Sequence, residues 1–397
     1  MSRARRGVGE AGRVIRAGPA DAPYEAFVPH PLPPDLVIDA DLLRRLSAAD
    51  RAIGELAGLG RTLPNPHLLM GLFIRREAVL SSRIEGTRTQ LADLYAYEAG
   101  QLVLPGMAPP PSADDAREVY NYVTALGHGI DRLNTLPMSL RLVREVHQHL
   151  MTGVRGEYAT PGEFRRTQNW IGPPGCTLAE ATFVPPPVAE MNDALAAWES
   201  YLHAGDGYPP LIRLALIHYQ FEAIHPFLDG NGRVGRLLTS LLLVHWDLLP
   251  LPLLYLSAYF EEHRDGYYER LLGVTRRGAW QAWVAFFLDG VARMARDGNE
   301  RARRLIDLQA EWRTRLAQAG RSATPLRAAE VLMSYPILTI PQAQQRLGVS
   351  YPTAKKAIER LVEAAILVPA GPQVYGRTYV ATEILRILGG QPTEPSN

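Results

Sequence analysis

Apolar residues recur at helical spacing through most of the chain, and an alternating strand pattern is almost absent before residue 320. A proline-rich, extended segment is expected at 22–38, a loop at 105–115 and a linker at 319–325. The chain is therefore predicted to be mostly α. The spacing predicts helices within 41–97 and over 116–126, 139–151, 187–204, 212–223, 233–246, 267–274 and 279–316.

The pattern changes beyond residue 325. A short helix over 326–334 is followed by a helix, a glycine-containing turn, a second helix, and a hairpin that turns near Gly371 and Pro372. This order predicts a winged helix-turn-helix. Both lysines of the protein, Lys355 and Lys356, lie on its second helix, where they suit phosphate contacts better than paired base readout. DNA binding is one interpretation, and protein contacts or dimerisation is the more common use of such a module.

Composition narrows the class of protein. The 397 residues are 47% hydrophobic and carry a net charge of +1, so no overall field attracts DNA or an anionic membrane. The single cysteine, Cys176, cannot form an intrachain disulfide, which fits a cytoplasmic location. The most apolar window, 237–256, is interrupted by polar residues and prolines, which predicts a buried helix and a turn rather than a membrane span. The basic segment 1–21 is expected to be a disordered tail.

The stretch HPFLDGNGRVGR, residues 225–236, concentrates chemistry in one loop. Its glycines and the start of the next helix let backbone N–H groups converge into an anion-binding nest. Arg233 and Arg236 share one helix face and can grip phosphates, while Asp229 in such a site calls for Mg²⁺. His225 can accept a proton near neutral pH. The residues therefore favour nucleotidyl or phosphoryl transfer over a plain helical turn with surface ion pairs.

The same combination, His-x-Phe-x-Asp-Gly-Asn-Gly-Arg-x-x-Arg, resembles the signature of the Fic family (filamentation induced by cAMP). Members mostly transfer AMP from ATP to a hydroxyl side chain of a target protein. The resemblance implies a role for each residue of the loop. His225 would be the general base, Asp229 the Mg²⁺ ligand, Gly230, Asn231 and Gly232 the anion hole, and Arg233 and Arg236 the groups that hold the β- and γ-phosphates.

A second motif lies in REAVLSSRIEGTRTQL, residues 76–91. Ser81 and Glu85 are four residues apart on a predicted helix, and Gly86 suits its end. An ordinary surface helix would have the same pattern, but the wider phrase resembles the inhibitory helix of some Fic proteins. That resemblance implies that Glu85 pairs with Arg236 and takes the place of the γ-phosphate. The same carboxylate could also orient water for AMP removal, which the sequence leaves open.

Two further regions resemble substrate-facing parts of the family. Residues 162–172 and 180–187 would line the nucleotide pocket and form a target flap, with Thr182, Phe183 and Val184 offering backbone for β-augmentation. The resemblance also places Tyr267 and Tyr268 near the nucleotide base, although such aromatic residues are more often part of a core.

The sequence thus predicts a mostly α protein with a Fic-type helical core, a small β flap and a C-terminal α+β winged helix. The expected function is autoinhibited protein adenylyltransferase, with ATP and a hydroxyl-bearing protein as partners, Mg²⁺ as cofactor and a homodimer favoured by the resemblance. The alternatives are an enzyme that also removes AMP and a nucleotide-sensing, DNA-binding regulator. The expected regions are a tail at 1–21, an inhibitory region at 22–110, a catalytic core at 111–318 and the winged helix at 325–385.

Overall fold

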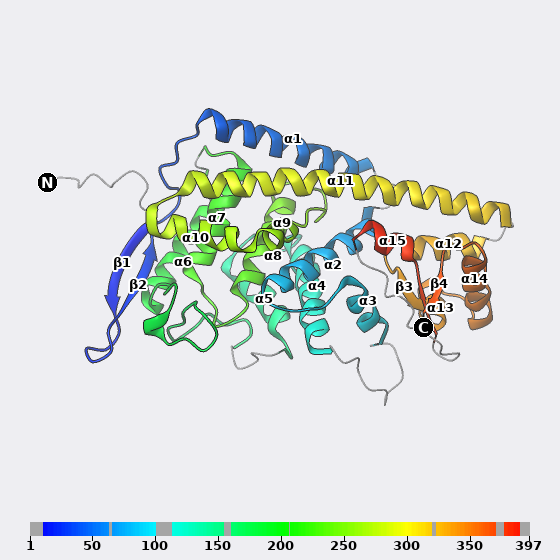
Figure 1. Ribbon diagram of the computed structural model, residues 1–397, viewed down its shortest axis with the longest axis horizontal. Helices are drawn as coiled ribbons and strands as arrows, with labels where there is room; N and C mark the ends of the chain where they lie inside the picture. Colours follow the sequence, from blue (N-terminus) through cyan, green and yellow to red (C-terminus); the bar gives the residue numbers. More distant parts are fainter. Residues whose placement is uncertain are drawn as a thin grey trace. The chain divides into compact units, whose positions relative to one another are not determined.

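The computed structural model describes residues 11–62, 66–100, 113–154, 160–205, 207–319, 323–370 and 377–389, and these form two compact units. The first unit takes residues 1–54, 124–249 and 256–294, and the second takes 55–123, 250–255 and 295–397. Helices make up most of both units, as the hydrophobic spacing predicts (Figure 1). Three of the unit boundaries fall inside helices, namely α1 (Ala40–Thr62), α4 (Ala113–Leu133) and α11 (Trp280–Ala319).

The first unit is built around two helices, α7 (Pro210–Ile224) and α8 (Asn231–His245). Nearly every residue of α7 is buried, which is the mark of a central helix with neighbours on all sides. The indoles of Trp198 and Trp283 donate to the Ile217 and Ala215 carbonyls of α7, so their polar atoms are satisfied inside the core. The other elements wholly in this unit are β1 (Gly12–Ala17), β2 (Tyr24–Pro29), α5 (Leu140–Met151), η2 (Leu178–Glu180), α6 (Val188–His203), α9 (Ser257–Glu262) and α10 (Arg264–Arg277).

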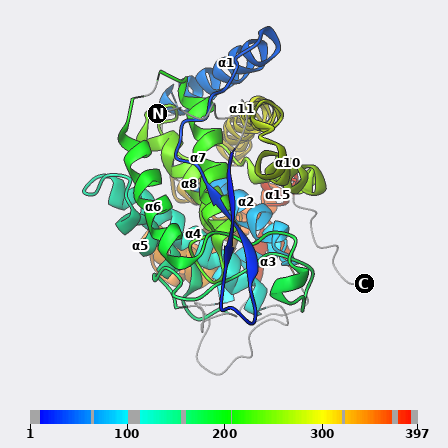
Figure 2. The same ribbon diagram turned by 90° about the vertical axis from the view of Figure 1, so that its left-hand side faces the viewer.

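The β1–β2 hairpin corrects one expectation from the sequence. Residues 12–17 pair antiparallel with 24–29, so the predicted disordered tail is wrong for them, and residues 1–10 lie outside the described part. Strand β2 packs against α6 and α7, and both figures show the hairpin beside these helices (Figures 1 and 2). The β1 sequence, GRVIRA, has its two large apolar residues side by side, so it lacks the apolar alternation that marks a strand, and Val14 is 62% exposed.

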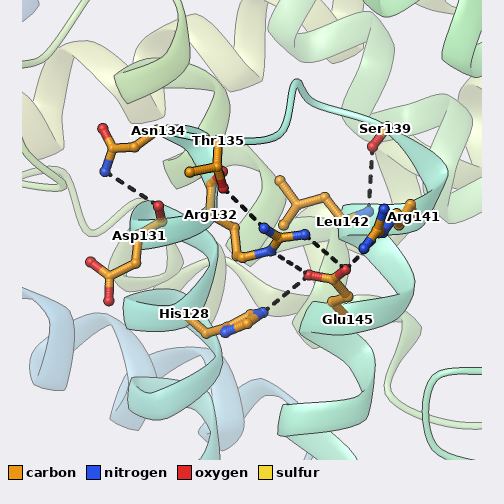
Figure 3. A network of polar contacts seen from close by, with 9 residues as sticks. All are labelled: His128, Asp131, Arg132, Asn134, Thr135, Ser139, Arg141, Leu142 and Glu145. Atoms are coloured by element: carbon orange, nitrogen blue, oxygen red, sulfur yellow. Dashed lines mark hydrogen bonds and ion pairs between the residues drawn. The ribbon is translucent and has the colours of Figure 1, made fainter.

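Helix α5 is fixed to the end of α4 by a charged cluster (Figure 3). Ser139 caps α5, and the Glu145 carboxylate accepts hydrogen bonds from Arg132 at 2.7 Å and Arg141 at 3.0 Å. His128 lies 3.3 Å from the same carboxylate. These donors, Arg132 first, lower the pKa of Glu145 to about 2. The cluster matters for function because α5 carries residues that support the loop at 225–230.

The second unit contains α2 (Pro66–Ile84), α3 (Leu91–Gly100) and the C-terminal elements. These are α12 (Ala323–Leu332), β3 (Ile337–Thr339), α13 (Ile340–Leu347), α14 (Tyr351–Glu363), β4 (Val368–Ala370), β5 (Thr378–Val380) and α15 (Thr382–Ile387). The strands form an antiparallel sheet in the order β3-β5-β4. The elements predicted for a winged helix are thus present, and the winged-helix assignment itself stays a prediction.

Local signals explain where α13 begins and ends. Thr339 and Gln342 form a capping box at the start of α13, and Gly348 ends it in the left-handed conformation at φ 65°. The predicted turn at Gly371 and Pro372 lies outside the described residues. Lys355 and Lys356 are exposed on α14, and the Lys355 ammonium lies 3.8 Å from Glu359, which offsets part of the charge available to a phosphate.

The apolar window at 237–256 forms the end of buried α8 followed by a turn, as predicted. Among the described residues, no helix combines the length and the apolar character that crossing a membrane requires.

We predict that Glu145→Gln lowers the free energy of unfolding by about 1–2 kcal/mol at pH 7. Because the folded pKa lies below the unfolded value, this stabilisation is present above about pH 4.3 and is lost as the pH falls toward 2. Urea unfolding across this range measures it. Glu163→Gln is the control, since its pair with Arg166 is 47% and 83% exposed and should contribute little. A penalty that is equal at pH 7 and pH 2.5 would contradict the prediction.

Candidate active site

The predicted anion-binding stretch connects α7 to α8. His225 ends α7 in the left-handed conformation at φ 50°, and its N–H donates to the Phe221 carbonyl at 3.0 Å. Gly230 is also left-handed, at φ 79°, and α8 begins at the next residue. A Cβ at Gly230 would lie 2.9 Å from the Met151 sulfur, so both space and conformation require glycine there. The loop therefore connects His225 to the N-terminus of a buried helix through five residues.

The Asn231 side chain stabilises the loop by bonding to its main chain. Its Oδ1 accepts from the Phe227 N–H at 2.8 Å, and its Nδ2 donates to the Phe227 carbonyl at 2.8 Å. The Phe227 carbonyl also accepts from Asn169 at 2.7 Å. The predicted anion-hole role of Asn231 can therefore rest only on its main chain, because its side chain holds the loop.

Arg165 holds the loop from outside, a role that the sequence did not indicate. Its guanidinium donates to the carbonyls of His225 at 3.0 Å, Thr167 at 3.2 Å and Pro186, and its N–H donates to the Pro226 carbonyl at 2.9 Å. Arg165 is 1% exposed, and burial lowers its pKa to about 10. The buried guanidinium on three backbone carbonyls, with the main-chain N–H on a fourth, ties residues 165–167 and 186 to the start of the loop.

His147 of α5 is a second support that the sequence did not reveal. Its Nδ1 accepts from the Gly162 N–H at 2.9 Å, so Nε2 carries the proton and donates to the Asp229 carbonyl at 3.1 Å. Burial lowers its pKa to about 4, which keeps the ring neutral at pH 7. The ring stacks on Phe227 with centroids 3.7 Å apart. A histidine on the apolar face of an amphipathic helix reads as a core residue in the sequence, and only the fold places it under the loop.

The His225 ring is oriented for proton transfer. Its Nδ1 lies 3.3 Å from the Glu222 carbonyl, a partner that can only accept, so Nδ1 carries the proton. The basic lone pair is then on Nε2. This tautomer agrees with the predicted role of His225 as a general base.

The phosphate-binding candidates surround the start of α8. Arg233 and Arg236 are 4% and 2% exposed, and an Arg233 Nη lies 3.6 Å from an Asp229 oxygen. The first N–H groups of any helix have no acceptor within the helix and carry partial positive charge. The Gly230 N–H, however, donates to Asp229 Oδ1 at 2.6 Å, so Gly230 contributes conformation here and not a donor for the anion hole.

Asp229 fits a Mg²⁺ ligand of the kind that shares the ion with phosphates. Its side chain is 51% exposed, and one oxygen is held by the Gly230 N–H. The described residues contain no group of three or more His, Cys, Asp or Glu side chains that could hold a metal ion. One carboxylate with substrate phosphates is a usual Mg²⁺ arrangement, so the residues present fit the ion.

Family models match both parts of the chain that carry the motifs. The Fic/DOC family N-terminal model matches residues 43–131, which contain Glu85, and the Fic/DOC family model matches 137–243, which contain the loop. The chain belongs to the Fic family.

Relatives and a solved structure agree with this membership. The chain is 30% identical over 154 residues to protein adenylyltransferase Fic of Culex quinquefasciatus, covering 38% of this chain and 27% of the relative. It is 27% identical over 209 residues to that of Drosophila grimshawi, covering 52% and 39%. The chain thus spans well under half the length of these relatives. A crystal structure of a Fic family protein from Desulfovibrio desulfuricans G20 has the same fold, with a TM-score of 0.56, 20% identity and coverage of 88% and 98%.

The two tyrosines predicted near the nucleotide base differ in this Fic protein. Tyr267 is 1% exposed, stacks on Phe260 and contacts His218 through its hydroxyl at 2.8 Å. This corrects the expectation for Tyr267, because a ring packed in the core is not available to a base. Tyr268 is 38% exposed and remains a candidate.

The flap segment makes more internal contacts than its predicted role requires. Phe183 forms an isolated antiparallel bridge with Ile171, and the Thr182 N–H also donates to the Ile171 carbonyl at 2.8 Å. The Val184 carbonyl accepts from the Phe27 N–H of β2 at 2.9 Å. The small β flap therefore exists as one bridge, and less of its backbone is available to a target strand than the sequence suggested.

The predicted inhibitory helix ends where the sequence indicated. Helix α2 stops at Ile84, and the Thr87 and Gly86 N–H groups donate to the Ser82 and Arg83 carbonyls, as in a Schellman motif. Gly86 adopts φ 103° with open space around it, so its conformation alone requires glycine. Ser81 is fully buried and Glu85 is exposed. The pairing of Glu85 with Arg236 stays a prediction.

We predict that Asn231→Ala lowers the free energy of unfolding by about 2–3 kcal/mol, because it leaves the buried Phe227 N–H without its acceptor. Urea unfolding followed by circular dichroism measures the change. The control is Asn134→Ala, whose exposed side chain makes one 3.3 Å bond to the Asp131 carbonyl and should contribute little. Equal effects of the two substitutions would argue against the loop clamp.

We also predict a pH dependence from His147. Its folded pKa of about 4 lies below the unfolded value of about 6.5, so the unfolded chain binds the extra proton first. Stability is full above pH 6.5 and falls as the pH drops from 6.5 to 4. His147→Gln should flatten this slope in melting temperature, whereas the exposed His203→Gln should leave it unchanged. A slope that persists in His147→Gln would show that other groups cause it.

Proposed function

We propose that the chain is a self-restrained protein adenylyltransferase, which transfers AMP from ATP to a tyrosine, serine or threonine hydroxyl of a target protein. The observation that carries the proposal is the stretch from His225 to Arg236, which combines a histidine with a basic Nε2, the N-terminus of a buried helix and two buried arginines. The names of the matched relatives support AMP transfer as the reaction.

The residues suggest one reaction sequence. Arg233 and Arg236 bind the β- and γ-phosphates of ATP, and the main chain at the start of α8 faces the phosphate oxygens. His225 Nε2 takes the proton of the target hydroxyl as its oxygen attacks the α-phosphorus. The bond from the α-phosphorus to the bridging oxygen breaks, and pyrophosphate leaves with the negative charge. Mg²⁺ held by Asp229 would neutralise charge on the phosphates.

The hydrogen bonds around the loop support catalysis by fixing these groups in advance. Donors that already point at developing charge need no rearrangement during the reaction, which is the main source of electrostatic stabilisation. The buried Arg165 adds positive charge at the His225 end of the loop. A small shift of His225 or of the α8 N-terminus would cost rate even without loss of binding.

Glu85 supplies the restraint in this proposal. An exposed carboxylate at the end of α2 is suited to pair with a guanidinium, and the partner that the family resemblance implies is Arg236. A carboxylate on Arg236 competes with the γ-phosphate for the same donors, so ATP binds in a pose unsuited to in-line attack. A homodimer, a cytoplasmic location and DNA contacts by α14 stay predictions from the sequence.

We predict that Glu85→Gly raises the rate of self-labelling or target labelling about tenfold or more over wild type. The protein is incubated with α-labelled ATP and Mg²⁺, and labelled protein is counted. His225→Ala in the Glu85→Gly background should lower the rate by about 10²–10⁴. Glu85→Gln, which keeps the size and removes the charge, should also raise labelling.

The outcomes separate the transferase from its restraint. Labelling that depends on His225 but is equal in wild type and Glu85→Gly would reject the restraint alone. No label in any of the four proteins, with ATP binding intact by calorimetry, would reject the transferase.

A further inference from the structure

A cavity with a positively charged lining lies within the other compact unit, at the C-terminal end of α2. It has a volume of about 540 Å³, within the usual range for small-ligand pockets. Its walls are aliphatic side chains of α2, of α3 and of the residue that follows α15, and none of its described lining residues is acidic. The polar lining consists of Arg76, Arg83, Thr87, Arg88 and Gln90, with Gly389 beside them.

Arg76 gives the cavity an unbalanced positive charge. Its guanidinium lies over the Tyr255 ring at 4.9 Å and donates through Nη1 to the Leu388 carbonyl, while its buried Nε has no hydrogen-bond partner. The nearby Arg301 donates a hydrogen bond from Nε to the Asp297 carboxylate at 2.7 Å. Burial and the charge of Arg301 lower the pKa of Arg76. Two partly buried arginines are thus offset by one carboxylate, which pairs with Arg301.

Thr87 adds a second polar group without a partner. It is 9% exposed, and its hydroxyl oxygen is buried with no hydrogen-bond partner. Two carboxylates of this region accept backbone hydrogen bonds instead, Asp115 from the Arg88 N–H at 3.2 Å and Asp93 from the Gln90 N–H at 2.9 Å. A buried donor without a partner is costly and is normally satisfied by water or a ligand.

We propose that this cavity is an anion site that binds a small phosphate-bearing molecule of the pyrophosphate or nucleoside polyphosphate class. Guanidinium groups match phosphate oxygens in geometry and charge, and a threonine hydroxyl can donate to a further oxygen. The three arginines and Thr87 provide both, in a pocket large enough for two or three phosphates. None of these residues belongs to the 225–236 loop, so the site does not depend on AMP transfer.

Hydrogen exchange of the full-length wild type, titrated with inorganic pyrophosphate, tests the site. Peptides over residues 79–91 report this cavity, and peptides over 225–236 report the candidate active site separately. We expect slower exchange over 79–91, with half-protection at a lower concentration of pyrophosphate than of inorganic phosphate. Arg83→Gln combined with Arg88→Gln should raise the half-protection concentration over 79–91 about tenfold or more. Arg51→Gln, an exposed arginine of α1, is the matched control and should change nothing.

Arg88→Gln alone guards against a folding defect, because this exposed side chain can be replaced without disturbing the core. It should raise the half-protection concentration by a smaller factor with an unchanged melting temperature. Absence of protection over 79–91 at millimolar pyrophosphate would overturn the proposal. Protection that survives the double substitution would also overturn it, because the effect would then come from binding elsewhere.

Discussion

The site depends on the short connection between the buried helices α7 and α8. The backbone N–H and carbonyl groups of this connection need hydrogen-bond partners outside a helix. The chain leaves α7 through a left-handed His225 and enters α8 through a left-handed Gly230, so the usual helical hydrogen bonds are interrupted there. Asn231 and Arg165 replace those bonds with side-chain contacts to the Phe227 and His225 main chain. A loop held in this way is rigid enough to present a helix N-terminus to an anion.

The buried charges around this connection are mostly positive. Arg165, Arg233 and Arg236 are all nearly buried, and burial strengthens their effect on a bound anion because little water screens them. The two buried histidines nearby, His147 and His218, are kept neutral, since burial lowers their pKa to about 4 and about 3. Neutral rings can pack and accept hydrogen bonds without adding to the repulsion among the arginines.

Helix α2 combines two features within a dozen residues. Its last residues end in a Schellman turn that places Glu85 at an exposed helix end, and its arginines, with Thr87 and Arg88 beyond the turn, line a cavity. The proposed restraint, the Glu85 carboxylate, and the proposed phosphate-binding arginines therefore lie on adjacent turns of one segment. An anion near the arginines and a carboxylate two residues away interact unfavourably, so the two features are not electrostatically independent.

The sequence by itself determined the helical class, the position of the loop, the end of α2 at Gly86 and the order of the helices in the C-terminal module. These features follow from local rules, namely apolar spacing, glycine conformation and capping residues, which a single segment carries within itself. Only the tertiary structure decided which residues hold the loop and whether Tyr267 is buried in the core. Arg165 and His147 are far from His225 and Asp229 in the chain, and the half-exposed strand β1 is stable only through pairing with β2. Whether a histidine, an arginine or a tyrosine is core, support or ligand depends on which distant backbone groups the fold brings to its polar atoms, and no local pattern records that.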